Sequence, residues 1–183
     1  MLGHDGGVAT VDVPERGGAW IADLGARARV TALDAMTVLG GAKKEIVLRW
    51  TQDDDDDVAR ADWAAWAKKG GRLPEVHAGA HMIVEVWSFA GEAPALLFAH
   101  EEQVWAMCCG SEIGPAPPRV GDEVVFSAPG AITLKVHAAW RADGRSWQID
   151  PFPDVEPVLL AWGSVKERGY RFDGARFVLA YER

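Results

Sequence analysis

Hydrophobic and polar residues alternate in short runs along most of the chain, and this alternation predicts β-strands with one buried face. The clearest run is EIVLRWT at residues 45–51, where Ile46, Leu48 and Trp50 fall on one face. Proline, glycine and aspartate separate the runs, as they do at turns. Further runs stand at residues 7–13, 19–25, 28–40, 81–89 and 122–128. The pattern therefore predicts a mainly β fold built as an antiparallel meander.

Asp-Gly pairs at residues 143–144 and 173–174 predict hairpins over residues 131–152 and 169–183, because Asp-Gly tolerates the positive φ angles of a type I′ turn. A two-residue turn in the second hairpin would place Arg171 opposite Arg176 and Tyr170 opposite Phe177. A short strand is predicted at residues 158–162. Residues 94–109 fit two strands or one bent strand, although their composition also suits a helix.

One segment has helical spacing. Five consecutive aspartates at residues 53–57 precede Trp63 and Trp66, and Lys68 and Lys69 follow before two glycines. Acidic residues at the start of a helix and basic residues at its end both favour the helix dipole. We therefore predict one amphipathic helix at about residues 57–69. A calcium site is the alternative, but calcium loops interleave their acids with other residues and a turn glycine.

The composition is that of a packed globular chain, with 183 residues, 49% hydrophobic and 25% charged. We expect residues 1–183 to form a single β-rich domain, either an open barrel or a two-sheet sandwich. The net charge is −8, and no basic stripe indicates a nucleic-acid partner. No apolar run is long enough to predict a membrane span. The N-terminus lacks a signal-peptide pattern, so the sequence as written predicts a cytoplasmic protein, or an extracytoplasmic one if a signal peptide was removed.

Four residues are candidate metal ligands. His77 and His81 are four apart and would share a face on a strand, and Cys108 and Cys109 are adjacent. The histidines could bind zinc if His100 or Cys108 completed the site, because a catalytic zinc takes about three protein ligands. For the cysteines we favour the interpretation as buried small hydrophobes, with a metal or redox role and a vicinal disulfide as alternatives. We favour structural roles and expect no cofactor, with calcium or zinc as the alternative.

Tryptophan is abundant, with nine residues in the chain. Trp140 and Trp147 flank the predicted turn at residues 143–144, where their rings would be exposed. Exposed tryptophans there would form a platform for a glycan or a protein partner, since tryptophan is enriched at binding hot spots.

Two stretches resemble degenerate blades of FG-GAP or VCBS repeats, namely GGAKKEIVLRW at residues 40–50 and RVGDEVVFSAPGAITLKVHAAW at residues 119–140. The stretch GYRFDGARFVL at residues 169–179 resembles the closing hairpin that often follows such blades. Those repeats occur in integrin-like propellers and bacterial extracytoplasmic proteins, and an Asp-rich calcium loop precedes the strand. Residues 39–43 and 120–122 retain the glycine but not those acids. The resemblance implies a β-meander scaffold for binding or surface display, without catalytic residues.

The sequence leaves three functions open. We expect a non-catalytic binding or protein-interaction module, because no G-x-S-x-G or H-E-x-x-H motif is present. The first alternative is a carbohydrate-binding module that uses Trp140 and Trp147. The second alternative is a metal-dependent enzyme that uses His77 and His81.

Overall fold

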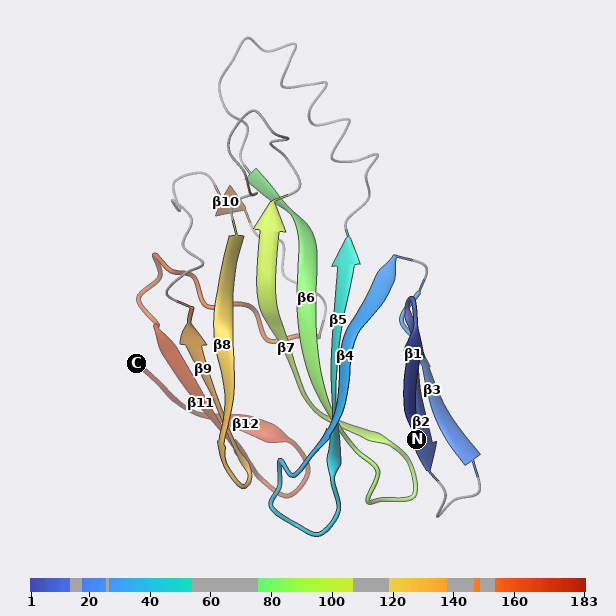
Figure 1. Cartoon of the computed structure of the whole chain (residues 1–183). Coiled ribbons are helices and arrows are strands. Elements are labelled where there is room, and N and C mark those ends of the chain that lie inside the picture. The colour runs from blue at the N-terminus through green and yellow to red at the C-terminus, as the bar shows by residue number, and fades with distance from the viewer. Residues whose placement is uncertain (14–17, 26, 54–75, 107–118, 138–146, 149–153) are drawn as a thin grey trace.

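The computed structural model describes residues 1–13, 18–25, 27–53, 76–106, 119–137, 147–148 and 154–183. These residues form β-strands in two sheets, joined by turns and loops (Figure 1). The predicted mainly β class is confirmed. The helix predicted at about residues 57–69 lies outside the described residues, and only the first aspartate of the acidic run, Asp53, is placed, at the end of a strand.

The order of the strands within each sheet is simple. The small sheet has the order β1-β2-β3, and the main path of the large sheet has the order β12-β11-β9-β8-β7-β6-β5-β4. Neighbours along that path are antiparallel. In the described residues, the strands at its two ends do not pair, so the sheet is open. The bounds are β1 Leu2–Asp5, β2 Val8–Val13, β3 Gly18–Asp23, β4 Ala28–Met36, β5 Glu45–Asp53, β6 Val76–Ser88, β7 Ala95–Ala106, β8 Arg119–Ala128, β9 Ala131–Val136, β10 Trp147–Gln148, β11 Glu167–Phe172 and β12 Phe177–Glu182.

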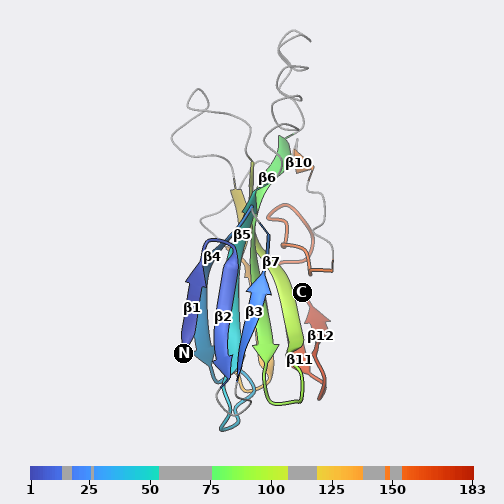
Figure 2. The same ribbon diagram turned by 90° about the vertical axis from the view of Figure 1, so that its right-hand side faces the viewer.

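The small sheet covers one face of β4, β5 and β6, as Figure 2 shows from the side. Ala9 of β2 packs there against Val30, Leu48, Trp50 and Ile83. The opposite face of β5 and β6 packs against the far end of the large sheet. The side chains that form that second core are Val38, Val47, Val84, Val86, Leu97, Phe98, Ile132, Leu134, Leu159, Tyr170 and Phe177. Both faces of the central strands are therefore buried, which explains why residues 46–48 and 82–84 are apolar without interruption.

The large sheet opens between β7 and β8. These strands pair only at residues 103–105 of β7, and below that point they diverge (Figure 1). Strands β8, β9, β11 and β12 then fold over the core formed with β5, β6 and β7. The opening matters because it leaves one side of the first half of β7 without a neighbouring strand in the described part of the chain.

The predicted hairpin over residues 131–152 is wrong. Strand β9 pairs with β8 and β11, whereas the two residues of β10 pair in parallel with Val76 and His77 of β6. The turn at residues 143–144 lies outside the described residues.

The predicted hairpin over residues 169–183 is confirmed as β11 and β12, but the predicted register is wrong. Phe172 pairs with Phe177 and Arg171 pairs with Val178, so the two arginines do not face each other. The loop is longer than two residues because Oδ1 of Asp173 accepts hydrogen bonds from the amides of residues 175 and 176. This side-chain acceptor stabilises a four-residue turn.

Candidate functional site

A short segment crosses the opening beside β7. Residues 154–160, here called the strap, make one parallel bridge, between Glu156 and His100. The N–H of Glu156 donates to the carbonyl of Ala99 over 3.1 Å, and the N–H of Glu101 donates to the carbonyl of Glu156 over 2.9 Å. The strand predicted at residues 158–162 is therefore wrong, because the strap makes only this one bridge.

Two buried carboxylates accept hydrogen bonds from backbone amides further along the strap. The N–H of Leu159 donates to Oδ2 of Asp122 on β8 over 2.8 Å, and the N–H of Val158 donates to Oε2 of Glu101 on β7 over 3.4 Å. The carboxylates are 1% and 0% exposed. Charged acceptors hold amides more strongly than neutral ones do. The strap is thus tied to both diverging strands by side chains.

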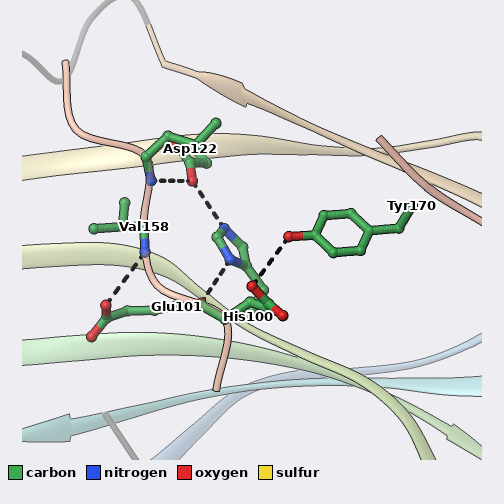
Figure 3. Close-up of polar contacts among 7 residues, drawn as sticks. His100, Glu101, Asp122, Val158 and Tyr170 are labelled. Carbon is green, nitrogen blue, oxygen red and sulfur yellow. Dashed lines mark hydrogen bonds and ion pairs between the residues drawn. The ribbon is translucent and has the colours of Figure 1, made fainter. Parts of the chain in front are cut away.

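His100 lies between the strap and Asp122 (Figure 3). Its Nδ1 is 3.0 Å from the carbonyl oxygen of Glu156, and its Nε2 is 3.0 Å from Oδ2 of Asp122. A carbonyl only accepts, so Nδ1 carries a proton. The Nε2 contact has the distance of an ion pair but not the alignment of a hydrogen bond. The imidazole thus faces the strap with one nitrogen and Asp122 with the other.

Burial raises the pKa of Asp122. Desolvation outweighs the opposite effects of His100, of the Leu159 amide and of Arg168. The second oxygen of this carboxylate, Oδ1, is buried and has no hydrogen-bond partner among the described residues. Asp122 is therefore a buried anion with incomplete compensation, and it takes up a proton more readily than an exposed aspartate does.

A second histidine-carboxylate pair lies next to the first. Nδ1 of His81 on β6 is 2.5 Å from Oε1 of Glu101, and both side chains are buried. Glu101 thus contacts His81 with one oxygen and the Val158 amide with the other. Strands β6, β7 and β8 each contribute a buried titratable group below the strap.

Two groups from β11 complete the surroundings of the strap. The hydroxyl of Tyr170 donates to Oε2 of Glu156 over 3.3 Å. Burial, followed by the charge of Glu156, raises the pKa of Tyr170 above that of an ordinary tyrosine. Arg168 lines a pocket together with residues 157–160 of the strap, and its Nε pairs with Glu182 over 2.7 Å. The strap is therefore contacted from β7, β8 and β11.

A groove of about 310 Å³ lies along the strap and β7. Leu96 lines it and is 43% exposed, while Phe98 and Phe177 in its lining pack edge to face with centroids 6.0 Å apart. Asp154 at the start of the strap has a φ of 60°, a left-handed conformation that does not continue extended pairing. The groove is lined by Leu96, Leu97, Phe98, Ala99, Asp154, Val155, Glu156, Arg176 and Phe177.

A different carboxylate is buried on the other face of the central strands. Glu85 of β6 accepts hydrogen bonds from the indole N–H groups of Trp50, at 3.1 Å, and Trp87, at 2.6 Å. Trp20 packs on Trp87 with centroids 5.1 Å apart, and Phe89 packs on Trp20 at 5.4 Å. Desolvation raises the pKa of Glu85 despite both indole donors. These tryptophans thus link the small sheet to β6.

The structure places only some of the predicted site residues. Trp140, Cys108 and Cys109 lie outside the described residues. Trp147 and His77 are placed by their backbones, in β10 and β6, and their side chains are outside the description.

The side chain of His81 is buried and contacts Glu101. A metal site shared by His81 and His100 requires β6 and β7 to be neighbours, and they are. However, His81 pairs with Val104 and His100 pairs with Val84, so the two histidines do not lie opposite each other. No group of three or more His, Cys, Asp or Glu side chains converges as metal ligands would within the described residues.

The sequence did not reveal His100, Glu101 and Asp122 as a cluster. Its available signal was the run of four polar residues at 100–103 within the otherwise apolar β7. Glu101 and Glu102 turn to different partners, because Glu102 pairs with Arg49 at 2.8 Å. The register of β6 and β7 shifts at this point, where Met82 pairs with Gln103 and Ile83 pairs with Glu101.

The chain matches no protein-family model, no curated protein and no solved structure. The resemblance to FG-GAP and VCBS repeats therefore stays a prediction from the sequence. None of the described residues forms a helix long and apolar enough to cross a membrane.

Proposed function

We propose that this chain is a non-catalytic protein-interaction module that binds an extended peptide segment of a partner protein along the first half of β7. The main support is the unpaired edge of β7 at residues 95–98. This segment pairs with β6 on one side, and no strand of the described part of the chain pairs with its other side. An extended peptide can add to such an edge through main-chain hydrogen bonds. The buried location of the titratable side chains argues against catalysis at the strap.

The groove beside this edge supports the same proposal. Strand addition gives affinity through the backbone, and pockets for alternate side chains give specificity. Leu96, Phe98 and Phe177 supply apolar lining for one such side chain. The strap covers the edge only from residue 99 onward, so the peptide would occupy the remaining length.

The charges around the groove indicate the chemistry of the peptide. Asp154 and Glu156 lie in the strap wall, and Arg176 lies in the wall formed by the β11–β12 turn. All three residues are exposed. A peptide with an apolar residue, a basic residue towards the strap and an acidic residue towards Arg176 complements these charges.

The test uses a phage-displayed library of random linear peptides panned on the whole chain. A synthetic peptide of the enriched sequence is then titrated by calorimetry into the wild type and Leu96→Asn. We expect Leu96→Asn to weaken binding by about tenfold, equivalent to about 1.4 kcal/mol, because it removes apolar contact area in the groove.

Leu179→Asn is the matched control, because Leu179 is 50% exposed on β12 and does not line the groove. Its affinity for the peptide should equal that of the wild type. A library without enriched sequences, or a peptide equally sensitive to both substitutions, would contradict strand addition at β7.

A further inference from the structure

A second pocket, of about 310 Å³, is lined by the end of the strap, by the loop that follows it and by Arg168 of β11. Residues 154–156 of the strap line the groove, whereas residues 157–160 line this pocket, and the described lining residues of the two do not overlap. Small-molecule sites in proteins have volumes of about 300–1,000 Å³. The pocket is therefore large enough for a small ligand and separate from the proposed peptide site.

The pocket is mostly apolar because it lies where two hydrophobic clusters meet. Val158 and Leu160 belong to the cluster formed with β7 and β8, whereas Leu159 and Val165 pack with the core around Phe98. An aliphatic group placed in the pocket would be removed from water by side chains of both clusters.

The backbone of this wall is fixed by hydrogen bonds on both sides of the turn at residues 160–163. The N–H of Gly163 donates to the carbonyl of Leu160 over 2.9 Å, and Nζ of Lys166 donates to the carbonyl of Ala161 over 2.6 Å. The preceding amides of the strap are held by buried carboxylates. A preformed wall lowers the entropic cost of ligand binding.

Arg168 is the one ionisable side chain among the described lining residues. Its Nε donates to Glu182, and the guanidinium also interacts with Tyr170. A guanidinium has five N–H donors, so these two partners leave donors for a ligand. Glu182 is 40% exposed, so water weakens its attraction for Arg168.

These features indicate the chemistry of the ligand. A carboxylate accepts two parallel N–H bonds from a guanidinium and carries the single negative charge that one arginine can balance. A phosphate monoester would bring additional charge into an apolar pocket without a second cation. An amine would be repelled by Arg168.

We propose that this pocket binds a small monocarboxylate with an aliphatic tail, with the carboxylate on Arg168 and the tail against Leu159, Leu160 and Val165. The site is additional to the peptide groove, and the failure of either proposal leaves the other intact.

The first test uses the wild type and four probes, namely octanoate, octanol, octylamine and acetate, each titrated at neutral pH below its micelle concentration. Amide chemical shifts in two-dimensional NMR spectra locate the site. We expect octanoate to give saturable shifts at residues 158–165 and 168, with an affinity at least about tenfold higher than that of octanol, because its carboxylate bonds to a charged donor. Octylamine should bind more weakly than octanol, and acetate should cause no shift at these residues.

Equal affinities of octanoate, octanol and octylamine would overturn the role of Arg168, and octanoate shifts confined to other residues would overturn the site. A tripeptide with a free C-terminal leucine carboxylate is titrated as a fifth probe. A clear preference for this peptide over octanoate would overturn the small acid as the ligand.

The second test compares Arg168→Gln with Arg171→Gln. Arg171 is the matched control, because it is exposed on the same strand and does not line the pocket. We expect Arg168→Gln to weaken octanoate binding by about tenfold or more and to change octanol binding by less than about twofold, since only the charged bonds are lost. Arg171→Gln should bind both probes as the wild type does.

Equal octanoate affinities of Arg168→Gln and Arg171→Gln would overturn the proposal. If Arg168→Gln fails to fold, the order of the probes on the wild type decides the question alone.

Discussion

The two faces of the central strands bury carboxylates in different ways. On the face covered by the small sheet, Glu85 accepts two indole N–H groups, from Trp50 and Trp87. On the opposite side of the molecule, Asp122 faces the imidazole of His100 and a strap amide. Burial raises the pKa of both carboxyls. The indoles join Glu85 to the small sheet, whereas His100 and the Leu159 amide join Asp122 to the strap, so only the second arrangement connects a buried carboxyl to a segment outside the strands.

The largest expected effect comes from removing the partner of Asp122. His100→Ala leaves the buried carboxyl of Asp122 without the imidazole that faces it, and breaking a buried pair from one side costs about 3–5 kcal/mol of unfolding free energy. Urea denaturation at pH 7 measures it. His4→Ala is the control, because His4 is exposed on β1. A loss no larger than that of the control would mean that the pair does not stabilise the fold.

A smaller loss is expected on the other face. Trp50→Phe keeps an aromatic ring but removes one indole donor to Glu85, and a buried acceptor that loses a hydrogen bond costs about 1–3 kcal/mol. Trp162→Phe is the matched control, because Trp162 is 39% exposed. Equal denaturation midpoints for the two variants would show that the Glu85 bonds contribute little.

The pH dependence of stability gives the third test. A carboxyl whose pKa is raised by folding contributes stability below its unfolded pKa, and that contribution is lost as the pH rises through the folded pKa. The unfolding free energy of the wild type, relative to Asp122→Asn, should therefore decline as the pH rises above about 4, by about 1.4 kcal/mol for each unit by which burial raises the pKa. Chemical denaturation at several pH values measures this difference. A relative stability that increases with pH would contradict the raised pKa.

The smallest effect is expected at the surface. Arg168 and Glu182 form an ion pair at 2.7 Å with side chains 21% and 40% exposed. Glu182→Gln should change the unfolding free energy by less than about 1 kcal/mol, because water and salt screen such pairs. A loss as large as that of His100→Ala would show that Arg168 depends on Glu182 for its place beside the strap.

The local sequence pattern predicted most of the strands but few of the residues that form the candidate site. Apolar runs at residues 45–51 and 81–89 predicted β5 and much of β6, and the structure buries both faces of these strands. The register of the last hairpin was mispredicted because the Asp173 side chain, and not the Asp-Gly pair alone, determines the turn.

The strap could not be predicted for a related reason. Val158 and Leu159 are apolar and look like strand residues, yet their amides bond to carboxylates of β7 and β8. The acceptors are 57 and 37 residues away in the chain. The pairing of His100 with Asp122 depends on the same long-range arrangement, so no local spacing indicates it.

The meander order has a kinetic consequence. From β4 to β9, every strand pairs with the next strand in the sequence, and contacts between near neighbours form faster than contacts across long loops. The strap needs β7, β8 and β11 to be in place before its bonds can form. We expect it to order last during folding and to open first in the native state, as a unit of local unfolding smaller than the domain.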